Sequence, residues 1–97
     1  MSIQTIQEKT SPVFKQFGVI KASLFGSAAR GQDTAESDVD LLVRVKRPFG
    51  LSSFVSLKRG LEQALNKSVD IVEYEAVKPE LEKNILKDAM VIYFIDR

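Results

Sequence analysis

The stretch FGSAARGQDTAESDVDLLV, residues 25–43, decides the fold that this sequence predicts. It holds the pair Gly26-Ser27, ten intervening residues, and then Asp38-Val39-Asp40, which an apolar run follows. Residues 19–25 have the apolar, β-branched character of a strand, and residues 37–45 predict a second one. The Gly-Ser pair therefore lies at the end of one strand, and the two aspartates lie at the start of the next.

Gly26 and Ser27 predict a turn that approaches a phosphate. A turn with little side-chain bulk lets backbone N–H groups and a small hydroxyl reach an anion, and a helix N-terminus favours negative charge. We expect a short helix at residues 28–30 after this turn. Arg30 is a further candidate phosphate ligand, and a surface ion pair is an equally good interpretation of it.

Asp38 and Asp40 are candidate metal ligands. Side chains alternate between the two faces of a strand, so both carboxylates point to one face, roughly 7 Å apart along the chain. Two carboxylates that face a phosphate-binding turn repel each other unless cations lie between them. Mg²⁺ prefers one or two carboxylates together with phosphate oxygens, and it fits this arrangement.

The spacing of the Gly-Ser pair and the Asp-x-Asp strand resembles the nucleotidyltransferase superfamily with the DNA polymerase β-type catalytic fold. The short length resembles its minimal nucleotidyltransferase (MNT) branch, and the resemblance covers nearly the whole chain. It implies an enzyme that uses ATP as substrate and two Mg²⁺ ions as cofactors. Gly26 and Ser27 would hold the β- and γ-phosphates, and Asp38 and Asp40 the metal ions.

Asp70 matches the third acidic position of that family, on the following strand. It lies among apolar neighbours, where an unpaired carboxylate is costly. The resemblance implies that Asp70 completes the metal site with Asp38 and Asp40, and that it is the best candidate for proton acceptor. For Asp70 considered alone, the alternative interpretation is a residue at the end of a strand that is exposed to solvent and has no functional role.

Two rival nucleotide-binding motifs are excluded. Gly26 and Gly31 have the spacing of a P-loop, but Gln32-Asp33 follow where that loop needs Lys and then Ser or Thr. The GxGxxG pattern of dinucleotide-binding proteins is absent from the sequence.

Composition narrows the class of protein further. A chain of 97 residues predicts a single domain, residues 1–97, and a net charge of +1 argues against strong direct nucleic-acid binding. The sequence has neither an apolar run of about 20 residues nor a signal-peptide pattern, so we expect a cytoplasmic protein without membrane contact. The absence of histidine excludes Ser-His-Asp catalysis, so a base must be a carboxylate, Lys or Tyr.

The remaining elements predict a small mixed sheet of about four strands flanked by helices, an α/β (α+β) fold. A first helix capped by Ser2 should kink or break near Pro12. A second, capped by Ser52 or Ser53, should end at Asn66, and its stripe of residues 54, 57, 61 and 65 should be core. Strands are expected at residues 69–74 and 90–95. A helix that starts at Pro79 should bury Leu81, Ile85 and Ala89, with residues 80 and 83 paired on its surface.

The MNT resemblance also implies a partner. Members of that branch pair with a helical HEPN-domain toxin, and the nucleotidyltransferase acts as antitoxin by transferring AMP from ATP to a toxin tyrosine. We therefore expect an adenylyltransferase in a toxin–antitoxin pair. The alternatives are an antibiotic-type enzyme that modifies a small molecule, and a non-catalytic module that neutralises its partner by contact. The acceptor pocket is either shallow or shared with another chain in a homo- or hetero-oligomer, and whether residues 90–95 form an interface stays open.

Overall fold

A four-stranded mixed sheet forms the centre of the molecule, with the strands in the order β3-β2-β1-β4. The computed structural model describes residues 1–95 apart from positions 33 and 35. A small polar loop is expected at residues 31–37, and these two positions of it lie outside the described residues. The strands are β1 (Val19–Phe25), β2 (Val39–Val45), β3 (Val69–Glu73) and β4 (Met90–Phe94). The helices are α1 (Ile3–Gln16), α2 (Gly26–Ala29), α3 (Leu51–Leu65) and α4 (Pro79–Leu86), with a 3₁₀ turn, η1 (Tyr74–Ala76), after β3.

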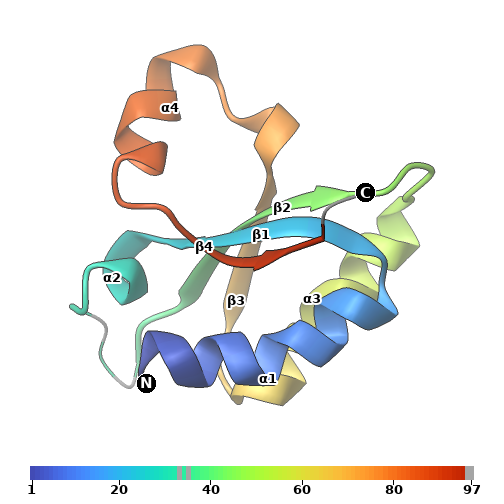
Figure 1. Cartoon of the computed structure of the whole chain (residues 1–97), viewed down its shortest axis with the longest axis horizontal. Coiled ribbons are helices and arrows are strands. Elements are labelled where there is room, and N and C mark those ends of the chain that lie inside the picture. Colours follow the sequence, from blue (N-terminus) through green and yellow to red (C-terminus); the bar gives the residue numbers. More distant parts are fainter. Residues whose placement is uncertain (33, 35, 96–97) are drawn as a thin grey trace.

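Helices α1 and α3 cover one face of the sheet, and α4 stands on its other side (Figure 1). The core lies between the sheet and these two helices, because each presents an apolar stripe to it. Phe14 from α1, Leu57 and Leu61 from α3, and Leu41 and Val43 from β2 are fully buried there. The mixed sheet with flanking helices that the sequence predicted is confirmed.

Helix α1 differs from the prediction at Pro12. Ser2 caps it as expected, since its hydroxyl accepts a hydrogen bond from the Thr5 N–H at 3.1 Å. The helix does not divide into two at Pro12. Pro12 and Glu8, whose carbonyl loses its partner there, are both exposed, so water can satisfy that carbonyl.

The ends of α3 are partly as predicted. Asn66 ends the helix in the left-handed conformation, with φ of 54°, which asparagine tolerates better than most residues. The expected serine cap is wrong: the helix starts at Leu51, after Gly50, and no side chain caps it. Ser52 and Ser53 therefore lie inside the first turn.

The predicted buried stripe of α4 is wrong. No residue of this helix is buried, and Leu81 is 48% exposed. Helical spacing fixes which side chains share a stripe, but among the described residues no strand or helix packs closely enough on α4 to bury it. Pro79 does occupy the first turn, as expected.

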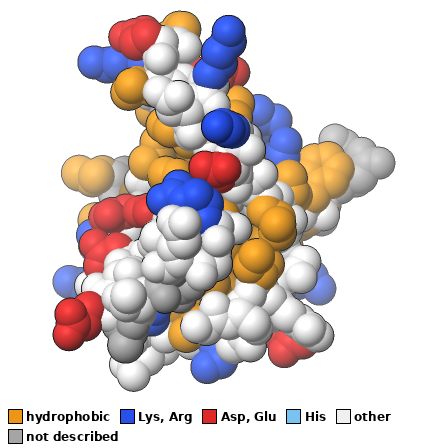
Figure 2. All heavy atoms as spheres, turned by 90° about the vertical axis from the view of Figure 1, so that its left-hand side faces the viewer, with side chains coloured by type: hydrophobic (Ala, Val, Ile, Leu, Met, Phe, Trp, Pro, Cys, Tyr) orange, Lys and Arg blue, Asp and Glu red, His pale blue; other side chains and the backbone are white. Residues whose placement is uncertain are grey.

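Hydrophobic side chains lie open to solvent among charged ones on the face shown in Figure 2. Strand β4 is the edge of the sheet next to β1, and Met90, Val91 and Phe94 are exposed on it. The apolar residues 90–95 were expected either to be covered on both faces or to form an edge that meets a partner. The exposure of these side chains excludes coverage on both faces. No helix in the described part of the chain is long and apolar enough to cross a membrane.

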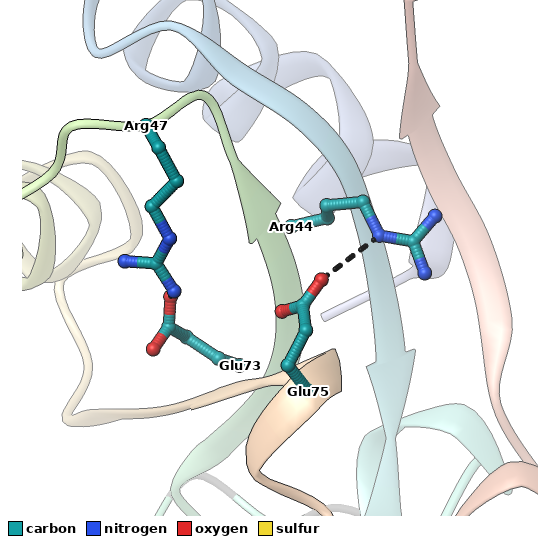
Figure 3. Close-up of polar contacts among 4 residues, drawn as sticks. All are labelled: Arg44, Arg47, Glu73 and Glu75. Carbon is teal, nitrogen blue, oxygen red and sulfur yellow. Dashed lines mark hydrogen bonds and ion pairs between the residues drawn. The ribbon is translucent and has the colours of Figure 1, made fainter.

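The parallel pairing of β2 with β3 is held at both ends. At its carboxyl end, Arg47 pairs with Glu73 at 2.7 Å and Arg44 with Glu75 at 3.2 Å (Figure 3). At the other end, the Val69 N–H donates to the Glu62 carboxylate of α3 at 3.0 Å. The exposed ion pairs contribute little, whereas the Glu62 contact satisfies the backbone of a buried residue.

We predict that Glu62→Ala lowers the free energy of unfolding by about 1–3 kcal/mol, because the buried Val69 N–H loses its acceptor. Urea denaturation measures this change. Gln63→Ala, an exposed position on the same helix, is the control and should change stability by less than about 0.5 kcal/mol. Equal effects of the two substitutions would contradict the role given to Glu62.

Candidate active site

The end of β1 brings the backbone against a carboxylate. Gly26 has a φ of +74°, a conformation that other residues adopt at a cost. A Cβ atom at this position would overlap Asp40 Oδ2 and lie 3.3 Å from Asp40 Cγ. Glycine is therefore required both by the turn and by the space that Asp40 occupies.

The turn continues into α2, which has only four residues. A helix this short has a weak macrodipole, so the expected contribution of a helix N-terminus to anion binding is small. The groups that could bind an anion here are therefore the backbone N–H groups of the turn and the half-buried Ser27 side chain. The helix occupies Gly26–Ala29, two residues earlier than predicted.

Asp40 and Asp70 are direct neighbours on adjacent strands. Their Cα atoms are register partners in the parallel β2–β3 pair, so both side chains project from the same face of the sheet. Asp38 lies just before β2. The pairing of β2 with β1 ends at Asp40 and Phe25, because β1 turns away at Gly26. The strand thus starts two residues later than predicted, and Asp38 is more exposed than Asp40.

The pKa of Asp40 is raised above its usual value. Burial is the largest cause, followed by repulsion from the carboxylates of Asp70 and Asp38, while the Arg30 guanidinium opposes the shift. These interactions show that the three aspartates are electrostatically coupled. The structure therefore places Asp38 and Asp70 within electrostatic range of Asp40, with Gly26 against Asp40.

Arg30 forms the surface ion pair that one of its two interpretations expected, and its role as a phosphate ligand stays a prediction. It is exposed, its Nη1 lies 3.4 Å from Asp88 Oδ2, and its Nε donates to Gln32 at 3.2 Å. It is also near enough to lower the pKa of Asp40. An exposed ion pair is weak, so Arg30 can exchange Asp88 for a phosphate at little cost.

The three aspartates fit a divalent cation by their chemistry. Carboxylate oxygens are the ligands that Mg²⁺ prefers, and a cation would relieve the repulsion that raises the pKa of Asp40. As the side chains stand, no three acidic groups in the described ranges converge closely enough to hold an ion. Binding would therefore draw the carboxylates together.

A groove of about 500 Å³ opens beside these carboxylates. Asp40 and Asp70 form part of its wall together with Phe25, and Ile71 and Val72 of β3 continue it. The opposite wall consists of side chains from the first two turns of α3: Leu51, Phe54, Val55 and Lys58. Sequence reasoning missed this groove.

The helical stripe explains that omission. Leu57, Leu61 and Leu65 are buried, which confirms them as core, but Phe54 at the end of the stripe is only half-buried and faces the groove as well. The sequence shows that Leu51 and Val55 are apolar residues outside the stripe, but it does not show that they are exposed.

We predict that Asp40→Asn leaves the metal-free protein equally stable or more stable above the range in which Asp40 ionises. Because its folded pKa is raised, the wild-type protein loses stability as pH rises from the unfolded value near 4 through the folded one. The advantage of the variant should vanish at lower pH. Thermal unfolding at several pH values measures it, with Glu36→Gln as control; a large loss of stability would mean that Asp40 has a structural partner.

We predict that Gly26→Ala and Gly31→Ala have different consequences. Both residues have a positive φ, so each substitution costs about 1–2 kcal/mol of stability. A Cβ at Gly31 meets nothing within 4 Å, whereas at Gly26 it displaces the Asp40 carboxylate. Titration with Mg²⁺ and a non-hydrolysable ATP analogue should show binding lost in Gly26→Ala and kept in Gly31→Ala; equal affinity in both would contradict this geometry.

Comparison with known proteins identifies the family. Residues 8–97 match the family model described as polymerase beta, nucleotidyltransferase. The chain is 39% identical over 90 residues to a Methanocaldococcus jannaschii protein named "Putative protein adenylyltransferase MJ0435", covering 93% of this chain and 97% of that one. It is 33% identical over 78 residues to "Protein adenylyltransferase MntA" of Thermococcus cleftensis, covering 80% and 79%.

Solved structures agree on the fold. A structure described as a "putative minimal nucleotidyltransferase" superimposes with a TM-score of 0.79 at 32% identity, over 93% of this chain and 95% of that one. A toxin–antitoxin crystal structure with AMP-PNP has a TM-score of 0.78 over 93% and 74%, at 20% identity, which supports the fold alone. The expectation from the Gly-Ser and Asp-x-Asp spacing is confirmed: the chain belongs to the polymerase β-type nucleotidyltransferase family, and its relatives are named protein adenylyltransferases.

Proposed function

We propose that this protein transfers AMP from ATP to a hydroxyl group of a partner protein, a tyrosine of a HEPN-domain toxin, and thereby acts as its antitoxin. The observation that carries the proposal is the contact of Gly26 with Asp40, beside Asp70. A turn that could receive a phosphate thus lies against Asp40, whose register partner Asp70 projects from the same face of the sheet. The names of the relatives, protein adenylyltransferases, support the same reaction.

The residues divide the work between donor and acceptor. Backbone N–H groups at Gly26 and the Ser27 hydroxyl hold the β- and γ-phosphates of ATP, and Arg30 adds positive charge at that end. Asp38, Asp40 and Asp70 would hold two Mg²⁺ ions, whose bound charge would neutralise the phosphates and lower the pKa of the acceptor hydroxyl.

The reaction is an in-line displacement. The acceptor oxygen forms a bond to the α-phosphorus, the bond from that phosphorus to the β-phosphate oxygen breaks, and pyrophosphate leaves with the electron pair. Asp70 accepts the proton of the hydroxyl and releases it to solvent. It is exposed, so this return to water is unhindered. Because the chain has no histidine, the Asp70 carboxylate is the best candidate for the base.

The test is the intact mass of the protein encoded beside this one after incubation with this chain, Mg²⁺ and ATP. We expect a gain of one or more AMP units that Asp38→Asn abolishes and that Glu36→Gln, an exposed acidic position two residues away, leaves intact. A stable complex without any mass gain would favour a neutralising module that acts by contact. No gain and no complex would favour a small hydroxylated acceptor.

A further inference from the structure

The groove between α3 and β3 lies on the acceptor side of the site. The sheet order β3-β2-β1 puts Gly26 and Ser27 at the β1 side of Asp40 and Asp70 at the β3 side. The groove shares Asp40 and Asp70, reaches Phe25 at one end, and extends past β3 to α3, where most of its lining lies. Asp40 and Asp70 therefore have the Gly-Ser turn on one side and the groove toward α3 on the other.

The geometry of an in-line displacement indicates which of these two sides receives the acceptor and which holds the leaving group. The attacking and leaving oxygens lie on opposite sides of the phosphorus that is transferred. If pyrophosphate leaves toward Gly26 and Ser27, the hydroxyl arrives from the side of Asp70. The open space on that side is this groove.

The lining of the groove selects the kind of acceptor. Apart from Asp40, Asp70 and Lys58 its walls are apolar, and Leu51 is 82% exposed and Val55 47% exposed at its rim. Such side chains suit an apolar protein surface that presents an aromatic hydroxyl. A polyhydroxylated sugar would need more hydrogen-bonding groups than these three charged side chains offer.

The one basic side chain in the lining is Lys58. Within the described residues it has no ion-pair partner. A free ammonium group repels a cationic amino-sugar, and it attracts a carboxylate near the acceptor hydroxyl. Charge and apolar surface therefore favour the same occupant, a segment of a partner protein.

We propose that Leu51, Val55 and Lys58 of α3 form the docking surface for the acceptor protein. Leu51 and Val55 pack against apolar side chains around the aromatic hydroxyl, and Lys58 pairs with an acidic residue next to it. This inference rests on the proposed function and adds to it the surface that chooses the acceptor. These residues touch the partner and not the donor nucleotide.

Steady-state kinetics with the partner protein used in the mass measurement tests this surface. We expect Leu51→Glu, Val55→Glu and Lys58→Glu each to raise the KM for that protein tenfold or more and to leave the affinity for a non-hydrolysable ATP analogue within twofold. Ser56→Glu adds the same charge at an exposed position of α3 outside the groove and should change neither constant. An unchanged KM for the partner would overturn the inference, and so would a loss of nucleotide affinity, which would mean that the groove holds the nucleoside.

A second measurement keeps the inference separate from the proposed chemistry. The photo-crosslinking amino acid p-benzoylphenylalanine is placed at position 51 or at position 56, and the protein is irradiated with the same partner, Mg²⁺ and the ATP analogue. We expect a covalent complex from position 51 and none from position 56, whether or not AMP transfer occurs. No crosslink at position 51, or equal crosslinking at both positions, overturns the docking surface, whereas a crosslink at position 51 combined with no mass gain in the measurement with ATP overturns only the proposed reaction.

Discussion

The parallel pairing of β2 with β3 is the constraint on which the site depends. It sets Asp40 directly beside Asp70, while the antiparallel pairing of β1 with β2 sets Phe25, and with it the Gly26 turn, on the other side of Asp40. A slip of one residue in either pairing would turn these side chains to the opposite face. The buried apolar residues of β2 prevent such a slip, because the same slip would bring Leu41 and Val43 out of the core.

This arrangement holds like charges together at a cost. Partial burial of Asp40, followed by repulsion from Asp70 and Asp38, raises the pKa of its carboxyl group, so ionising the site without a ligand costs stability. Among the described residues, only the Arg30 guanidinium opposes that shift. A site built for structure alone would pair these carboxylates, whereas a site that binds cations and phosphates leaves the repulsion for its ligands to relieve.

Much of this could be predicted from the sequence, because short-range patterns determine it. The strand at residues 19–25 and the end of α3 at Asn66 follow from local propensity and turn chemistry. The family spacing led to the carboxylate triad. Local patterns failed where the outcome depends on distant neighbours. The apolar stripe of α4 exists in the sequence, but only the fold determines that nothing covers it.

The groove could not be predicted for the same reason. Its walls come from α3 and β3 and meet the aspartates only after the sheet has formed. Leu51 and Val55 are ordinary helix residues in the sequence, and their exposure gains a meaning only beside Asp70. The structure thus adds to the carboxylates a groove that the sequence did not reveal, and we propose that this groove receives the acceptor.

The central claim is that the three aspartates and the Gly-Ser turn form a single site for a nucleotide and its cations. Counting the Mn²⁺ ions bound per chain by electron paramagnetic resonance, with and without a non-hydrolysable ATP analogue, tests it most directly. The account predicts weak binding of Mn²⁺ alone, two ions bound per chain with the analogue, and loss of both in Asp40→Asn. Nucleotide that binds equally well without a divalent cation, or Mn²⁺ binding that survives Asp40→Asn, would contradict it.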